Sequence, residues 1–297
     1  MKNSMNVRNI IPLAMGLYSR LLPKRAGVTL ERVFLTPGRL KLRPEELSVM
    51  RRAAALPLRF DCTRMMPVFQ WGEEGAPVVA LVHGWAGRAG QLAAFVDPLL
   101  ARGFRVVAME APGHGAADGQ RSSIVEFIHA LRLIERQFGP LHGVVAHSMG
   151  GAASLMASAR GLDASRLAII GTPDRPAGYL PYIGQMLGFS PDAIAEAKAR
   201  IEQKFGMPMA DLDPVEDGRG LTADVLVIHD RHDRQVRFSS ARRLADAIPG
   251  SRLMETERLG HVRILKDSRV IDAVTIFLGS TGRRRAALPE QVEKAVI

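Results

Sequence analysis

A serine with small neighbours is the sharpest chemical signal in the chain. Ser148 follows a short apolar run, 143–145, and precedes an alanine-rich stretch that is compatible with a helix. A serine on a tight turn between a strand and a helix lies in front of the helix's first backbone N–H groups, where developing negative charge is stabilised. Such a turn needs small neighbours, and Ala146 and Gly150 supply them. The pattern predicts attack by Ser148 on a carbonyl group, and a serine that only caps the helix is the alternative.

Strand-like and helix-like segments alternate around this serine from about residue 58. Apolar runs typical of strands buried on both faces span 78–82, 105–109, 143–146, 166–170, 225–228 and 252–254. Helical spacing lies between them, as in Phe127, Leu131 and Ile134, which follow a capping sequence from Ser123 to Glu126. This alternation is typical of an α/β protein.

One long stretch, between the runs that end at residue 170 and start at residue 225, contains no convincing strand. Ser190 and Pro191 mark the start of a helix within it. A helical insertion of this length predicts a lid or cap over a site. Its apolar residues favour an apolar acyl or alcohol group in the substrate; they are Leu180, Ile183, Met186 and Leu187.

Five motifs, in one order along the chain, resemble the α/β-hydrolase superfamily in its serine-nucleophile, esterase-like branch. They are His83-Gly84-Trp85, the loop 111–115, the turn 146–150, the segment 227–236 and Leu259-Gly260-His261. The likeness covers roughly residues 57–279, and it departs from the family at Ala146, Asp230 and Arg237, where the family more often has Gly, Gly and Pro. The resemblance implies the α/β-hydrolase fold, with a mostly parallel sheet, helices on both faces and a helical cap insertion.

The same resemblance implies a role for each matching residue. Ser148 would be the nucleophile, His261 the general base and Asp233 the acid that orients the base. The backbone N–H groups of Trp85 and Met149 would hold the oxyanion. The residues expected to support these loops are His83, Gly84, Ala146, His147 and Gly150.

Other residues compete for two of these roles. Asp230 competes with Asp233 for the acid, and the resemblance favours Asp233. His232 competes with His261 for the base, but it directly precedes Asp233, so the two side chains should point apart. His114 lies in a glycine-rich turn and is expected to tie that loop together.

Metal and nucleotide sites are not expected. The chain has no HExxH, GxGxxG or GxxxxGK[ST] motif, so we expect no metal and no cofactor. Cys62 is the single cysteine, which excludes an intramolecular disulfide and suits a reducing cytoplasm.

The charge distribution and the hydropathy of the chain limit the binding partners that we expect. The net charge of +10 is dispersed and aromatic residues make up 5%, so no nucleic-acid partner is expected. No apolar run is long enough to span a membrane. The apolar stretch 10–18 is interrupted by Pro12 and followed by Arg20, which argues against a removed signal. This N-terminal segment is expected either to pack on the protein's own surface or to contact an anionic membrane.

These expectations divide the chain into an N-terminal extension (1–56), a core (57–171 and 222–279), a helical cap (172–221) and a basic C-terminal tail (280–297). We expect a cytoplasmic serine hydrolase that cleaves an ester or similar acyl bond of a small apolar substrate. If the N-terminal segment contacts a membrane, the protein would be membrane-peripheral. A thioesterase, acyltransferase or cofactor-free perhydrolase would use the same residues. A non-catalytic binding or membrane-associated protein is the alternative of another class, and the oligomeric state is left open.

Overall fold

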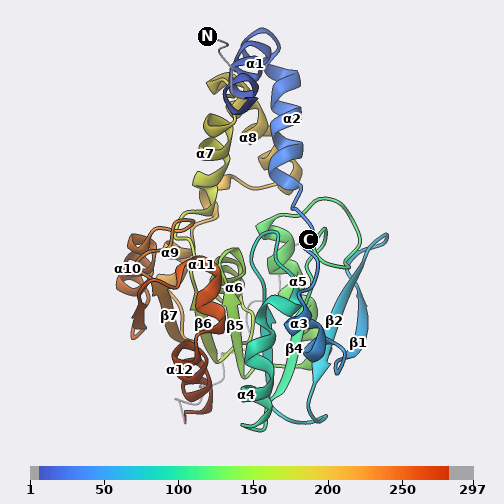
Figure 1. Cartoon of the computed structure of the whole chain (residues 1–297), viewed down its shortest axis with the longest axis vertical. Helices are drawn as coiled ribbons and strands as arrows, with labels where there is room; N and C mark the ends of the chain where they lie inside the picture. The colour runs from blue at the N-terminus through green and yellow to red at the C-terminus, as the bar shows by residue number, and fades with distance from the viewer. Residues whose placement is uncertain (1–6, 281–297) are drawn as a thin grey trace, which may run out of the picture.

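The computed structural model describes residues 7–280 and has an eight-stranded sheet at its centre (Figure 1). The strand order is β1-β2-β4-β3-β5-β6-β7-β8. β1 pairs with β2 and β2 with β4 in antiparallel fashion, and the remaining neighbours are parallel, as the α/β prediction requires. The strands are β1 Ala54–Arg59, β2 Met65–Trp71, β3 Val78–Val82, β4 Arg105–Met109, β5 Gly143–His147, β6 Arg166–Ile170, β7 Asp224–Asp230 and β8 Arg252–Thr256.

The central strands are apolar throughout because both faces of the sheet are covered. Every residue of β3, β5 and β6 is buried. In register, Leu81 of β3 lies beside Ala108 of β4 and Val145 of β5. Since these strands are parallel, their carboxyl ends meet at one edge of the sheet, and the loops expected to carry the chemistry leave from that edge.

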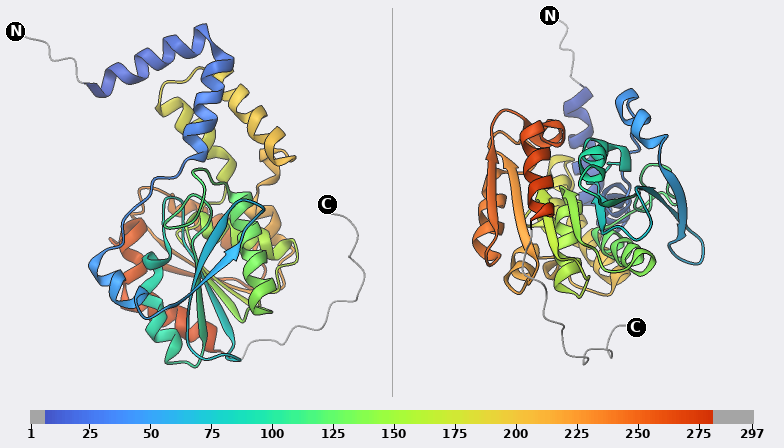
Figure 2. Two further views of the ribbon diagram at one scale, coloured as in Figure 1. Left: turned by 90° about the vertical axis from the view of Figure 1, so that its right-hand side faces the viewer. Right: turned by 90° about the horizontal axis from the view of Figure 1, so that it is seen from below.

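Helices cover both faces of the sheet (Figures 1 and 2). One hydrophobic cluster joins the sheet to α5, α6 and α10, and a second joins its other face to α3, α4 and α12. The bounds of the core helices are α3 Pro44–Met50, α4 Val96–Leu100, α5 Ile124–Phe138, α6 Met149–Ala159, α9 Pro214–Arg219, α10 Phe238–Ala247, α11 Gly260–Arg263 and α12 Ser268–Gly279, with a 3₁₀ helix at Ala89–Phe95.

Two segment boundaries differ from those expected. The sheet begins at Ala54 rather than at residue 57, because β1 and β2 form an antiparallel pair that the apolar runs did not reveal. α9, inside the expected cap 172–221, packs on the core helices α6 and α10. A 2.7 Å ion pair joins Asp217 of α9 to Arg160 at the end of α6. α9 therefore lies with the core.

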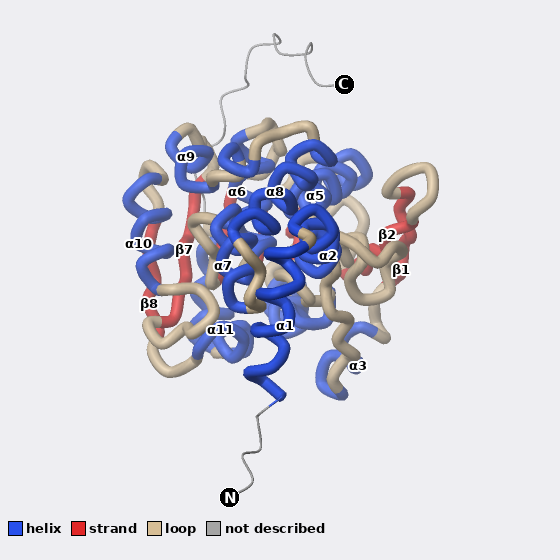
Figure 3. The backbone as a smooth tube through the Cα atoms, turned by 90° about the horizontal axis from the view of Figure 1, so that it is seen from above, coloured by secondary structure: helices blue, strands red, loops and turns tan. Residues whose placement is uncertain are grey.

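A second layer of helices lies above the carboxyl edge of the sheet (Figures 1 and 3). We call it the helical layer; it consists of α1 Val7–Leu21, α2 Pro23–Leu35, α7 Tyr179–Met186 and α8 Pro191–Phe205. α2 packs closely on α8, because a side chain at Gly27 would come within 2.4 Å of the Glu196 side chain. Leu30 of α2 and Ala197 of α8 are fully buried in a hydrophobic cluster of this layer alone.

The first two helices of the N-terminal extension, α1 and α2, thus form one structural unit with α7 and α8 of the central insertion. The buried Glu31 of α2 accepts a 2.6 Å bond from Arg200 of α8, which fixes the two helices in register. Among residues 7–280, no helix is long and apolar enough to cross a bilayer. The expected basic tail, 280–297, lies outside the described residues except for Ser280.

Candidate active site

Ser148 occupies a strained turn between β5 and α6. Its backbone has φ 53° and ψ −122°, a combination that residues other than glycine rarely adopt. The turn is held because the Ser148 N–H donates to the Ile170 carbonyl at 2.8 Å, and its own carbonyl accepts from Gly151 at 2.9 Å. The side chain makes no capping bond to α6, so the alternative in which Ser148 only caps the helix is wrong.

The small neighbours of Ser148 are required by close contacts. A side chain at Gly150 would come within 2.4 Å of the His83 carbonyl oxygen. One at Gly84 would come within 2.8 Å of the Ser148 Cβ. Ala146 is completely buried. The loop 83–85 therefore lies directly against the serine turn, as expected.

His261 and Asp233 form a hydrogen-bonded pair. His261 Nδ1 lies 2.6 Å from Asp233 Oδ2, and both side chains are more than nine-tenths buried. Asp233 Oδ1 accepts from the backbone N–H groups of Gln235 and Val236. Burial favours a raised pKa for Asp233, but the bond to His261 and its charge outweigh it and hold the pKa below the usual value. The ionised carboxylate places the proton on Nδ1, which leaves Nε2 free to accept another.

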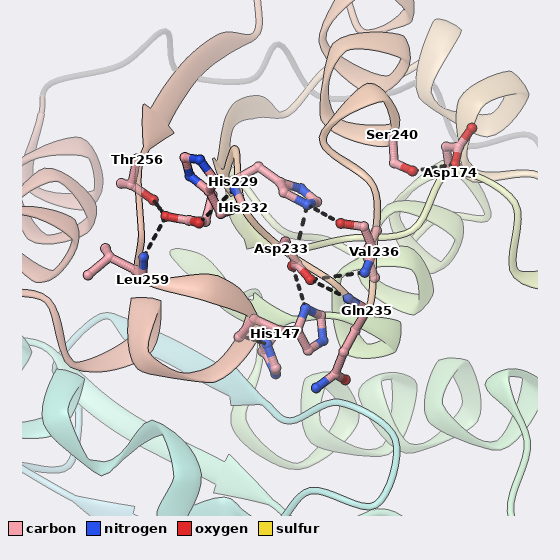
Figure 4. A network of polar contacts seen from close by, with 12 residues as sticks. His147, Asp174, His229, His232, Asp233, Gln235, Val236, Ser240, Thr256 and Leu259 are labelled. Carbon is pink, nitrogen blue, oxygen red and sulfur yellow. Dashed lines mark hydrogen bonds and ion pairs between the residues drawn. The ribbon is translucent and has the colours of Figure 1, made fainter.

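Asp230 has a different task from Asp233, whose bonds to Gln235 and Val236 are drawn in Figure 4. Its carboxylate accepts from Thr256 Oγ1 and from the N–H groups of His232 and Leu259, so it ties together the loops on either side of the pair. His232 is exposed and lies outside the cavity described below. The structure therefore brings Asp233, not Asp230, to His261.

Two further histidines, His229 and His147, hold the backbone around the His261–Asp233 pair. His229 Nε2 donates to the Val236 carbonyl at 3.0 Å and lies 3.5 Å from Asp233 Oδ2. His147 Nε2 donates to the carbonyl of His261 at 2.9 Å, and the two rings are 4.6 Å apart. Burial, reinforced by the charge of His261, lowers the pKa of His147 to about 3, so this ring is neutral. His147 holds the backbone of His261 in place.

The loop 83–85 is oriented by a neutral histidine. The Ala111 N–H donates to His83 Nε2, so Nδ1 carries the proton and donates to the Gly84 carbonyl at 2.7 Å. Burial lowers the pKa of His83 to about 3. Because a trans peptide directs its carbonyl and its N–H to opposite sides, the N–H of Trp85 points away from His83. Met149 opens α6, where backbone N–H groups are unpaired within the helix.

One cavity of about 480 Å³ contains the predicted reacting residues. Ser148, His261, Trp85 and Met149 all line it. Within the described residues the Ser148 hydroxyl has no hydrogen-bond partner, and His261 is in the same cavity with its Nε2 unused. The remaining lining is mostly apolar and comes largely from α7, α8 and the segments next to them; it includes Tyr179, Ile183, Ile201, Phe205, Met209 and Leu212. Of the four apolar residues expected on the cap, Ile183 lines the cavity, Leu180 is buried in the layer, Leu187 is partly buried against the same cluster and Met186 is exposed.

Several residues of the site were missed from the sequence, including three from the N-terminal extension and one glycine next to His261. Phe34, Leu35 and Leu40 of the N-terminal extension line the cavity. Leu30 and Phe34, four residues apart after Pro23, carry the signal of an amphipathic helix, but no periodicity identifies its partner. Gly171 has φ +60°, and a side chain there would lie 3.2 Å from His261 Nδ1. No sequence motif marked that approach.

Metal ligands are not gathered at this site. Within residues 7–280, no group of three His, Cys, Asp or Glu side chains is arranged to hold an ion. The chemistry that the arrangement itself offers is proton transfer by His261 next to a hydroxyl at a helix N-terminus.

Known proteins share both the sequence pattern and the fold. A model of the alpha/beta hydrolase family matches residues 79–273. A pyrethroid hydrolase from Sphingobium wenxiniae is 35% identical over 154 residues, which cover 49% of this chain and 50% of that protein. A serine hydrolase-like protein from Danio rerio is 33% identical over 139 residues, which cover 42% of this chain and 40% of the relative. The chain thus spans half or less of these relatives' length.

Solved structures show the same architecture. An esterase from Pyrococcus furiosus superposes with a TM-score of 0.61 over 82% of this chain and 98% of the esterase. The two chains are 16% identical, so this likeness concerns the fold alone.

Proposed function

The chain belongs to the α/β-hydrolase family, and from this we propose that it is a serine hydrolase that cleaves a carboxylic ester, or a similar acyl bond, through an acyl-Ser148 intermediate. The observation that carries the proposal is the convergence of Ser148, on its strained turn, with the buried His261–Asp233 pair in one cavity. This is the constellation that nucleophilic acyl transfer needs.

The proposed reaction has two halves. Ser148 Oγ attacks the carbonyl carbon while His261 Nε2 takes the hydroxyl proton, and the imidazolium that forms is stabilised by the ionised Asp233. His261 then returns this proton to the leaving alcohol as the bond to it breaks. A water molecule, deprotonated by the same nitrogen, then attacks the acyl-serine. As the bond between the acyl carbon and Ser148 Oγ breaks, His261 returns that proton to Oγ and the acid is released.

The negative oxygen of each tetrahedral intermediate needs donors that are already in place. We assign this role to the N–H groups of Trp85 and Met149. The support is that both residues line the cavity, and that the bond from His83 to the Gly84 carbonyl fixes the peptide that carries the Trp85 N–H. Loss of one such donor costs about 3–4 kcal/mol of barrier.

The substrate class follows from the cavity. Its apolar lining and its volume of about 480 Å³ suit a small substrate with an apolar acyl or alcohol group. We propose that the helical layer acts as its cap, because α7, α8 and the end of α2 supply much of that lining. The name of the Sphingobium wenxiniae relative, a pyrethroid hydrolase, is compatible with an apolar substrate.

The direct test is ester hydrolysis by the purified protein and by Ser148→Ala. With p-nitrophenyl esters of short and medium acyl chains, we expect the variant to lose turnover by roughly 10³-fold or more. Ser158→Ala is the matched control, since Ser158 lies on the same helix and its hydroxyl has no partner within the described residues. Full turnover in Ser148→Ala would refute the proposal. Competing thiols, alcohols and peroxide then separate hydrolysis from acyl transfer by their products.

A further inference from the structure

α1 exposes a stripe of leucine side chains. Leu13, Leu17 and Leu21 are 77%, 63% and 69% exposed. They are four residues apart, so they lie on one face of the helix. Arg20 lies on the same face, three residues after Leu17. Three exposed leucines in a row form an apolar surface that nothing in the described chain covers.

The opposite side of α1 is fixed to the helical layer. The Ser19 hydroxyl accepts from the Ser190 N–H, and the Ser190 hydroxyl donates to the Ser19 carbonyl, both at 2.9 Å. A side chain at Gly188 would come within 2.3 Å of the Pro12 carbonyl oxygen, so the helix lies directly on the turn between α7 and α8. These contacts hold α1 with its leucine stripe directed outward. Figure 2 shows α1 at the end of the molecule farthest from the sheet.

Uncompensated positive charge accompanies the stripe. Arg20, Lys24, Arg25 and Arg32 are exposed on α1 and α2, and within the described residues none has a carboxylate partner. Glu31 is the one acidic residue between positions 12 and 36, and it is buried and bound to Arg200. The exposed side of this helix pair is therefore apolar and cationic together.

We propose that this face, formed by the leucine stripe of α1 with Arg20 and with Lys24 and Arg25 of the first turn of α2, docks on an anionic lipid surface. Leucines enter the boundary of the acyl chains while the long basic side chains reach lipid phosphates, which is how interfacial helices bind. A second copy of the chain is a poor occupant, because pairing two such faces would oppose like charges.

The placement also relates docking to the cavity. The docking face belongs to the helical layer, and α2, α7 and α8 of that layer each contribute residues to the cavity lining. If the proposed function holds, docking brings lipid that contains an apolar substrate next to the helical layer, which lines the cavity that would bind this substrate. The docking itself is measured without any enzymatic readout, so the two proposals can fail separately.

Co-sedimentation with vesicles tests the docking. We expect the full chain to bind phosphatidylcholine vesicles that contain phosphatidylglycerol, to bind pure phosphatidylcholine vesicles at least about tenfold less, and to be released by salt. Leu17→Glu and the double variant Arg20→Glu with Arg25→Glu should each weaken binding about tenfold or more. Ile276→Glu and Arg102→Glu are the matched controls, because these residues are exposed at the opposite end of the molecule, on α12 and after α4. The controls should bind as the wild type does.

Three results would overturn the proposal. They are no binding by the wild type to the anionic vesicles, binding that survives both Leu17→Glu and the double arginine variant, and binding that the controls lose equally. Gel filtration adds a further check, since a dimer that Leu17→Glu dissociates, without vesicle binding, would assign the face to a second copy instead. Thermal unfolding of each variant excludes misfolding, and hydrolysis of a soluble ester should be unchanged in Leu17→Glu.

Discussion

The bond between His261 and Asp233 determines which nitrogen of the histidine can act as a base. At 2.6 Å from an ionised carboxylate, Nδ1 must carry a proton, so Nε2 is the nitrogen that accepts one from Ser148 in the proposed reaction. Asp233 is itself fixed by two backbone N–H groups, and His147 holds the His261 carbonyl. The orientation of the base thus depends on the bonds that hold Asp233 and the His261 backbone.

Asp233→Asn tests this orientation. An amide at this position donates where the carboxylate accepted, which favours the wrong tautomer of His261, so we expect kcat for ester hydrolysis to fall by roughly 10³–10⁴-fold. Asp174→Asn is the control: Asp174 is also a buried carboxylate, but it bonds Ser240 and Arg243. It should lose stability and keep kcat within about threefold. Equal losses of kcat in both variants would contradict the assignment.

The buried neutral histidines make stability depend on pH. Burial lowers the pKa of His83 and of His147 to about 3 and that of His114 to about 4, from 6.5 in the unfolded chain. Between these values the unfolded state binds more protons than the folded state, so their contribution is complete above pH 6.5 and is lost as pH falls toward 3 to 4.

His147→Gln tests that dependence. The amide group can still donate to the His261 carbonyl but does not titrate. Urea unfolding between about pH 5.5 and about pH 4 should show a pH slope of the unfolding free energy that is smaller by about one proton, or about 1.4 kcal/mol per pH unit, than in the wild type. An unchanged slope would mean that His147 is protonated in the folded protein.

Among the elements, the carboxyl ends of β5, β6 and β7 position the site. β5 leads into the Ser148 turn and β7 into the Asp233 loop. β6 lies between them and is followed by Gly171, which lies next to the His261 ring. Glycine is needed at this position, because the backbone adopts a left-handed conformation there and passes close to the imidazole ring.

Gly171→Ala should therefore damage more than the backbone. Alanine at φ +60° costs about 1–2 kcal/mol of stability, and its methyl group would also press on His261 from 3.2 Å, so we expect kcat to fall roughly tenfold to a hundredfold. Gly206→Ala is the matched control, since its φ is +66° and the space for a side chain is open. It should show the loss of stability in a thermal melt with kcat unchanged. A fall in kcat in neither variant would show that the strand end does not position the base.

The end of α2 belongs to the cavity wall, so it should influence substrate preference. Phe34→Ala removes apolar lining, and we expect KM for medium-chain esters to rise about tenfold while KM for an acetate ester changes little. Val33→Ala, at the neighbouring exposed position of the same helix, does not alter the lining and should behave as the wild type. A comparison of kcat and KM over acyl lengths makes the measurement. A rise for all chain lengths alike would point to a disturbed layer rather than to selective contact.

At the scale of the whole molecule, the central insertion packs against α2 near the N-terminus. α2 and α8 are far apart in sequence, yet they share one hydrophobic cluster and the Glu31–Arg200 bond. Periodicity predicts a helix at 191–205, but it does not say which surface that helix meets. The N-terminal extension could therefore not be placed over the cavity from the sequence, and two readings of it remained open.

The sequence predicted the buried strands more accurately than the partly exposed ones. The run 78–82 was predicted with its correct bounds because five consecutive apolar residues need cover on both faces. β1 and β2 were missed because they are partly exposed and contain Pro57 and Pro67. The choice of Asp233 over Asp230 depended on family resemblance, since the two lie three residues apart at the end of one strand and only their arrangement in space separates their roles.

The account depends most on Ser148 as an activated nucleophile. The most direct measurement is reaction with a fluorophosphonate probe, followed by peptide mapping by mass spectrometry. We predict a single adduct on the peptide that contains Ser148, formed at least about a hundredfold more slowly in His261→Ala. An unmodified wild type under conditions where it is folded, or an adduct on another residue, would contradict the account.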